Sequence, residues 1–161
     1  MPEHHRVAII GSFKQHYAPI LEAHREFTAA GWEITSPLGD PVVHEGVDFV
    51  RFTSDPEAWD DAMVQTVALH RILRADLVYV LAPSGYVGRT TCYEIGRVVQ
   101  ADRPVYFSER PEDLPLTLPA DHVASPAEVV ARTASAALEP LYSGSALPHA
   151  ELERDLIIGK W

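Results

Sequence analysis

The chain of 161 residues has a single cysteine, Cys92, which excludes an internal disulfide and a cysteine-based metal cluster. His4 and His5 have no partner at a spacing typical of a metal site, so we expect neither a metal ion nor another cofactor. Basic residues are few as well, because 13 Lys and Arg stand against 23 Asp and Glu, for a formal net charge of -10. No basic face indicates a nucleic-acid polymer as partner. An acidic protein can still bind a phosphate locally, through backbone N–H groups and one or two arginines.

Long apolar runs are also missing. The N-terminal stretch "MPEHHRVAIIGS" is too polar for a signal peptide or a membrane span, which predicts a soluble, cytoplasmic protein with no membrane partner. Hydrophobic residues make up 47% of the chain, enough for one core. We therefore expect one α/β domain over residues 1–142. Residues 143–161 form a linker and an amphipathic tail, a candidate for packing on the partner subunit of a homodimer or higher homo-oligomer.

Apolar segments alternate with helical patterns along the chain, which predicts a doubly wound α/β fold with a mainly parallel, Rossmann-like or flavodoxin-like sheet. Buried strands are expected at 6–12, 32–37, 76–82 and 103–108, with short strands near 47–52 and after the Pro-rich loop 109–122. Helices are expected at 17–31, from a cap at Ser54 or Asp55 to about residue 74, from about 91 to 101, and at 125–142. The last of these begins with a capping box, Ser125 to Glu128.

In such sheets ligands bind beyond the carboxyl ends of the strands, and two segments of this sequence fall there. The first is "GSFKQHY", in which Gly11 lets the chain turn closely and the backbone near Ser12 and Phe13 can face an anion or a sugar. An ordinary strand-to-helix turn explains the same residues equally well. The segment is not a GxGxxG fingerprint, so a dinucleotide site has little support.

The second segment is "LAPSGYVGRTTCYEIG", residues 81–96. Gly85 and Gly88 permit a positive φ or the close approach of a ligand. Arg89, Thr90 and Thr91 follow where a helix begins. Helix amides, two hydroxyls and a guanidinium together predict a phosphate-binding site.

Glu94 has two interpretations. Thr91-x-x-Glu94 matches a capping box, which would make Glu94 a structural residue in the first helical turn. A carboxylate at this place can also serve a reaction at a bound ligand, and helix N-terminal amides would then keep it ionised.

The segment 75–107 resembles the nucleoside 2-deoxyribosyltransferase superfamily, which includes nucleoside-monophosphate N-glycosidases. The pattern is a buried strand opened by Asp, a loop with Gly, Glu-(Leu/Ile)-Gly on a helix, and a strand begun by Lys/Arg-Pro. The matching residues here are Asp76, Gly85 and Gly88, Glu94-Ile95-Gly96, and Arg103-Pro104. The "GSF" turn is similar to the family's first loop, and the resemblance covers roughly residues 6–107.

The resemblance implies that Glu94 is the nucleophile that attacks C1′ of the sugar and displaces the base. It implies that Tyr17 orients this nucleophile, although packing at a helix start explains Tyr17 equally well. Asp48 is a candidate for a loop over base or sugar, with a solvated loop as the alternative. Two family aspartates are missing, because Gly88 stands at one position and Leu69 or His70 at the other. His70 is a candidate acid or base contact in their place.

These departures argue against deoxyribosyl transfer, and Arg89-Thr90-Thr91 favours a 5′-phosphorylated substrate. The leading hypothesis is therefore an N-glycosidase acting on a nucleoside 5′-monophosphate. Base exchange through the same covalent intermediate is one alternative, and a nucleotide-binding sensor without turnover is another. The loop "PSGYVG…E" is also similar, more weakly, to the PGGxGTxxE loop of cytokinin-activating phosphoribohydrolases.

Overall fold

The central feature of the fold is a four-stranded parallel sheet. The structure, a computed structural model, describes residues 4–38, 41–42, 51–52, 55–141 and 148–160. The sheet order is β2-β1-β5-β6, formed by β1 (Arg6–Gly11), β2 (Glu33–Ser36), β5 (Leu77–Leu81) and β6 (Val105–Phe107). β3 (Pro41–Val42) and β4 (Arg51–Phe52) form a separate antiparallel pair. The predicted doubly wound α/β fold is confirmed.

The two central strands are buried on both faces. β1 and β5 pair in parallel from Val7 opposite Leu77 to Gly11 opposite Leu81, and every residue of β5 is buried. Their sequences, "RVAIIG" and "LVYVL", are nearly continuous apolar runs, as expected for strands that have helices on both sides.

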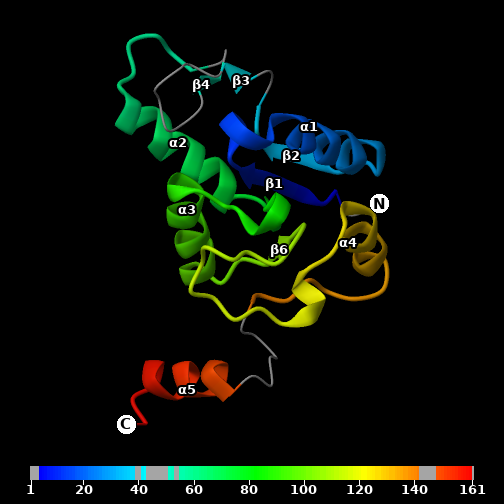
Figure 1. The fold of residues 1–161 in the computed structure, drawn as a ribbon, viewed down its shortest axis with the longest axis vertical. Helices are drawn as coiled ribbons and strands as arrows, with labels where there is room; N and C mark the ends of the chain where they lie inside the picture. The colour runs from blue at the N-terminus through cyan, green and yellow to red at the C-terminus, as the bar shows by residue number, and fades with distance from the viewer. Residues whose placement is uncertain (1–3, 39–40, 43–50, 53–54, 142–147, 161) are drawn as a thin grey trace.

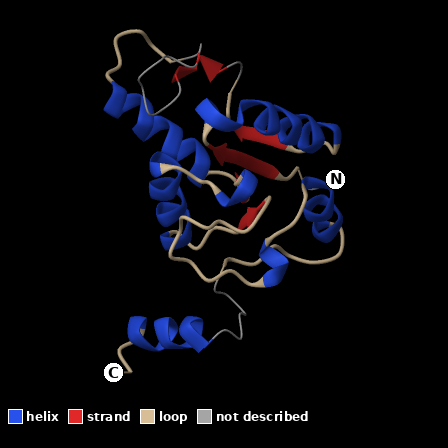
Figure 2. Cartoon of the chain, viewed as in Figure 1, coloured by secondary structure: helices blue, strands red, loops and turns tan. Residues whose placement is uncertain are grey.

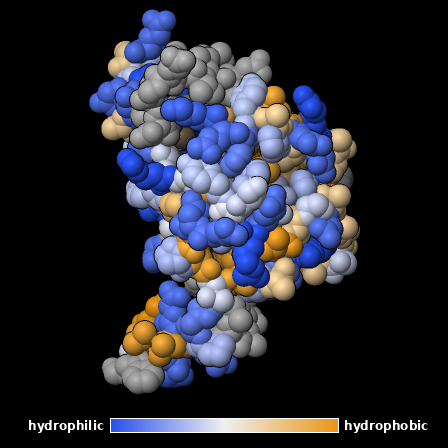
Figure 3. Space-filling view, viewed as in Figure 1, coloured by the Kyte–Doolittle hydropathy of each residue, from blue (hydrophilic) through white to orange (hydrophobic). Residues whose placement is uncertain are grey.

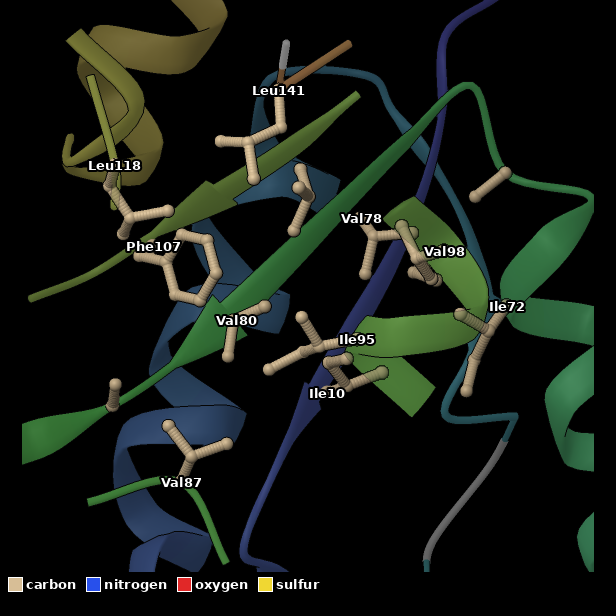
Figure 4. Packing of buried hydrophobic residues seen from close by; sticks show 14 residues of the cluster. Ile10, Ile72, Val78, Val80, Val87, Ile95, Val98, Phe107, Leu118 and Leu141 are labelled. Carbon is tan, nitrogen blue, oxygen red and sulfur yellow. The ribbon is translucent and has the colours of Figure 1, made fainter. Parts of the chain in front are cut away.

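Helices cover both faces of the sheet (Figures 1 and 2). α1 (Phe13–Ala29) and α4 (Pro126–Thr133) pack on one face, where Phe27 and Val129 join a cluster with Val7 and Tyr79. α2 (Asp61–Leu73) and α3 (Arg89–Gln100) pack on the other face. The side chains that meet there include Ile10, Val78 and Val80 from the strands and Ile72, Ile95 and Val98 from the helices (Figure 4).

Three helix boundaries show the largest differences from the predicted ones. α1 begins at Phe13 rather than near residue 17, and a kink with non-helical φ and ψ at His16 precedes Pro19, which supplies no N–H to the preceding turn. α2 begins at Asp61 because the Asp60 carboxylate caps it, accepting the Met63 N–H at 2.8 Å. α4 has the predicted Ser125–Glu128 capping box but ends at Thr133 instead of near residue 142.

The structure also differs from the sequence-based prediction after the Pro-rich loop. The short strand expected after the Pro-rich loop is reduced to one bridge, between Phe107 and Val123, which follows η2 (Ala120–His122). The amphipathic tail forms α5 (Pro148–Ile157), which leaves Leu156, Ile157 and Ile158 more than half exposed. Figure 3 shows this apolar patch below the body of the molecule. Packing of α5 on a partner subunit stays a prediction.

At the start of a buried strand, Asp76 is expected to have a structural role and to accept hydrogen bonds from loop backbone amides. The structure has Asp76 in a structural role, but the donor is different. The Asp76 carboxylate accepts the Arg6 backbone N–H at 2.9 Å and pairs with the Arg6 guanidinium at 2.8 Å, so β1 rather than a loop supplies the hydrogen bonds. The guanidinium lowers the pKa of this carboxyl below its usual range. No described helix is long and apolar enough to cross a membrane.

The fold generates a stability prediction at Tyr79, whose buried hydroxyl donates to the Ala124 carbonyl at 2.9 Å. Tyr79→Phe leaves that carbonyl without this donor, so the free energy of unfolding should fall by about 1 kcal/mol. Urea unfolding measures the change. The control is Tyr93→Phe on the exposed surface of α3, which should alter stability by less than about 0.5 kcal/mol. Equal stability of the two variants would contradict the structural role of the Tyr79 hydroxyl.

Candidate active site

A cavity of about 520 Å³ lies at the carboxyl ends of β1 and β5. The chain leaves β1 toward β2 on one side and later returns to β5 on the other side, so this edge is the topological switch point of the sheet. The loop after β1 and the loop after β5 therefore meet there. A site between them is the expected location for a ligand in a fold of this class, and the volume lies in the range of small-molecule sites.

Two helices begin at the cavity, and neither has a side-chain cap. Ser12 is the N-cap of α1 and Gly88 the N-cap of α3, and both line the cavity without a capping side-chain hydrogen bond. By contrast, Asp60 caps α2, and a capping box closes the start of α4. Helix N-termini attract anions because their amides and dipoles present partial positive charge. Among the four α-helices whose N-cap residue the structure describes, α1 and α3 are the two without a side-chain cap, and both begin at the cavity.

The charges of the cavity wall differ from those of the whole chain. Lys14 and Arg89 are the cations of the described lining, and Glu94 is its only carboxylate. A chain with a net charge of -10 therefore has a described cavity lining with a formal charge of +1 when Glu94 is ionised and +2 when it is protonated. This local excess of positive charge favours an anionic ligand.

Glu94 is not part of a capping box, and this interpretation of the sequence is wrong. Gly88 adopts a φ of 89° and ends the preceding loop, so α3 starts at Arg89 and its first intrahelical bond runs from the Cys92 N–H to the Gly88 carbonyl. Thr91 is inside the first turn and buried, and Glu94 falls in the second turn. Glu94 lines the cavity instead of folding back on the helix start.

Burial sets the protonation of Glu94. It raises the pKa of this carboxyl from 4.5 to about 8, since ionisation removes a proton in surroundings that solvate charge poorly. The expectation that helix amides keep the carboxylate ionised is also wrong, because a second-turn residue lies beyond the N-terminal amides. At neutral pH most molecules hold Glu94 protonated.

The cavity brings together most of the residues that the sequence singles out. These lining residues are Gly11, Ser12, Phe13, Gly88, Arg89, Thr90, Thr91 and Glu94. The Gly88 N–H already donates to Asp113 at 3.3 Å. What Gly88 contributes to the cavity is therefore mainly the absence of a side chain. A Cβ there would lie 3.3 Å from the Tyr86 hydroxyl, and the left-handed φ adds strain for any other residue.

Four predicted residues are not brought to the cavity. Tyr17 is exposed in α1, and Gly85 is buried beneath Arg110 and Glu112. Asp48 lies outside the described residues. His70 is exposed on α2, because it is two residues, or about 200°, around the helix from Ala68, which faces the cavity.

Sequence reasoning missed several polar residues of the wall. Gln65 of α2 is the polar side chain that this helix presents to the cavity, and Lys14 and Gln15 come from the first turn of α1. Tyr86 lines the cavity as well and stands edge-on to His16, with the ring centroids 5.7 Å apart. One signal was available for Tyr86, since an aromatic residue between two glycines is poorly placed for core packing.

Comparisons of the chain with protein-family models, with curated proteins and with solved structures found no match. The functional argument therefore depends on the cavity itself.

The buried carboxyl predicts an unusual pH dependence of stability. Between pH 4.5 and 8 the folded chain holds a proton on Glu94 that the unfolded chain has lost. The stabilising contribution of protonated Glu94 is therefore complete below about pH 4.5 and is lost as the pH rises toward 8. Glu94→Gln does not titrate and keeps the side-chain size. It should match the natural chain near pH 5 and exceed its stability by roughly 1–3 kcal/mol at pH 8.5, measured by urea unfolding.

The matched control is Glu128→Gln. Hydrogen bonds from Ser125 lower the pKa of Glu128, so its contribution is present above the unfolded pKa and is lost as the pH falls. This variant should lose stability at pH 8.5. A Glu94→Gln variant that is less stable than the natural chain at pH 8.5 would contradict the burial of an uncompensated carboxyl.

Proposed function

We propose that the protein is an N-glycosidase that hydrolyses the base–sugar bond of a nucleoside 5′-monophosphate. The observation that carries the proposal is the convergence of one half-buried carboxyl with two cations and two helix N-termini in a single cavity. The cations and helix starts suit a phosphate, and the carboxyl suits the electron-poor sugar carbon. The resemblance of residues 75–107 to the nucleoside 2-deoxyribosyltransferase superfamily points to the same chemistry.

The phosphate is assigned to the start of α3. Arg89 supplies a guanidinium, Thr90 and Thr91 supply hydroxyls, and the helix dipole adds partial positive charge. Ser12 and Lys14 at the start of α1 complete the polar wall on the opposite side. The 5′-phosphate would fix the sugar so that C1′ lies within reach of Glu94, which is one turn further along α3.

The reaction would proceed through a covalent ester. The ionised Glu94 oxygen bonds to C1′ while the C1′–N bond breaks and its electron pair leaves with the base. Water then cleaves the ester, so that overall its hydroxyl ends on C1′ and its proton on the base. Burial leaves the Glu94 anion poorly solvated, and bond formation at C1′ neutralises it, so the cost of ionisation is recovered along the reaction.

Release of free base from a panel of ribo- and deoxyribonucleoside 5′-monophosphates tests the proposal. Glu94→Gln removes the nucleophile and should lower base release by roughly a thousandfold or more, while nucleotide binding persists. Saturable binding by the natural chain without base release would indicate a sensor, and transfer to an added second base would indicate a base-exchange enzyme. Near-normal base release by Glu94→Gln would exclude Glu94 as nucleophile.

The pH profile separates a nucleophile from a general acid. A nucleophile must be ionised, so kcat/KM should rise about tenfold per pH unit between pH 6.5 and 7.5 and level off above about 8. A general acid would give a nearly flat profile over the same range and a fall of about tenfold per pH unit above the pKa. Assays above pH 6.5 keep the substrate phosphate largely in its doubly charged form, so the slope reports the enzyme.

Arg89→Ala tests the phosphate assignment. Loss of the guanidinium should weaken the use of a nucleotide by about tenfold or more and leave the use of the matching nucleoside nearly unchanged. Steady-state kinetics on both substrates measure this selectivity. Arg71→Ala is the control, because Arg71 lies on α2 outside the cavity and pairs with Asp55. Equal losses on nucleotide and nucleoside would remove Arg89 from the phosphate site.

A further inference from the structure

The loop before α3 is held by a segment 25 residues further along the chain. This segment, residues 109–113, follows β6 and contacts the loop at three places. The Glu109 carboxylate accepts the Ser84 N–H at 3.1 Å, and the Glu112 N–H donates to the Gly85 carbonyl at 2.9 Å. The third contact is made by Asp113, whose oxygens accept the Val87 N–H at 3.1 and 3.2 Å and the Gly88 N–H at 3.3 Å.

The loop needs such support because it has an unusual backbone with one strained residue. Ser84, Gly85 and Gly88 have positive φ values of 56°, 77° and 89°, which only the glycines adopt without steric cost. For Ser84 this conformation costs on the order of 1 kcal/mol, and such conformations persist only where the surroundings fix them. The segment also approaches closely, since a Cβ on Gly85 would lie 2.6 Å from the Glu112 side chain.

We propose that Asp113 is a positioning residue that fixes the start of α3 for binding of the substrate phosphate. The proposal rests on the function proposed above, and it concerns a residue that does not line the cavity. Asp113 holds the two amides that directly precede Arg89, in the residues where the chain turns from the strained loop into the helix.

Asp113 should affect the phosphate site more than it affects Glu94. Arg89 follows Gly88 directly, so a shift of the loop moves its backbone at once. Glu94 lies one turn further on, next to Ile95, which is fully buried in the core. Loss of Asp113 would therefore disturb the start of the helix while the body of α3 stays packed on the sheet.

The charge of Asp113 predicts the opposite effect, which makes the two roles separable. A carboxylate near a phosphate site repels the ligand, and the charge of Asp113 already reaches its surroundings, since burial raises the pKa of Cys92 and Asp113 adds to that rise. If charge alone mattered, Asp113→Ala and Asp113→Asn would both bind phosphate more tightly. If position matters, Ala removes the hydrogen bonds whereas Asn keeps an oxygen acceptor for them.

The experiment measures binding of inorganic phosphate by the full chain, by calorimetry or NMR titration, together with base release from a nucleotide and its nucleoside. Asp113→Ala should weaken phosphate binding by about tenfold and raise KM for the nucleotide alone. Asp113→Asn should restore both values to within about threefold of the natural chain. The matched control is Glu109→Ala in the same segment, which should change phosphate affinity by less than about twofold because it contacts Ser84 rather than the helix start.

Unchanged phosphate binding in Asp113→Ala overturns the positioning role, as does tighter binding in both Asp113 variants or no binding by the natural chain. Should Asp113→Ala fail to fold, Asp113→Glu replaces it. The longer side chain keeps the charge and displaces the acceptor, so it should bind phosphate less well than the natural chain, and equal affinity overturns the role. A natural chain that binds phosphate but releases no base refutes the proposed function while leaving the role of Asp113 measurable.

Discussion

The parallel pairing of β1 with β5 is the constraint on which the rest of the structure depends. Five consecutive residue pairs, from Val7 and Leu77 to Gly11 and Leu81, fix the two strands in register. Both strands are buried on both faces, so a slip of one residue would exchange the side chains of the two core clusters. Because the register is fixed, the strands end side by side, and the loops that start at Ser12 and Ala82 have to share one edge of the sheet. The convergence of two helix starts at the cavity follows directly from this pairing.

A second constraint acts against stability. A single, half-buried carboxyl lies in the described wall of this cavity, with no compensating group strong enough to keep its pKa near 4.5. A site selected only for stability would hold an amide or an apolar residue there. The loop beside it adds a second cost, since Ser84 adopts a left-handed conformation that other parts of the chain must hold in place. Such a concentration of unfavourable features at one edge of the sheet is typical of functional sites.

The sequence was informative where local chemistry decides the structure. The four sheet strands were predicted because parallel strands are nearly continuous apolar runs, and the Ser125–Glu128 capping box because its two hydrogen bonds are local. The start of α3 was mispredicted, because the Thr91-x-x-Glu94 pattern competes with a glycine N-cap whose conformation depends on Asp113, 25 residues away. His70 was misplaced because the face of α2 that meets the cavity is set by packing against distant segments, and that packing brings Val64, Ala68 and Ile72 to the cavity instead. No local pattern indicates Asp113 or Gln65, whose roles arise only when distant segments meet.

The contrast between the acidic chain and its cationic cavity links these observations. With 23 acidic and 13 basic residues, most of the surface repels anions, and a phosphate gains favourable potential only at a local site. Lys14, Arg89 and two helix starts supply that site, and Glu94 remains protonated at neutral pH when the cavity is empty. A protonated Glu94 keeps the cavity more positive for the arriving anion. In the proposed reaction, the carboxylate would be needed only afterwards, when positive charge develops on the sugar carbon and stabilises the anion that desolvation disfavours. A raised pKa would therefore serve both proposed steps, and a permanently ionised carboxylate at this position would oppose the first of them.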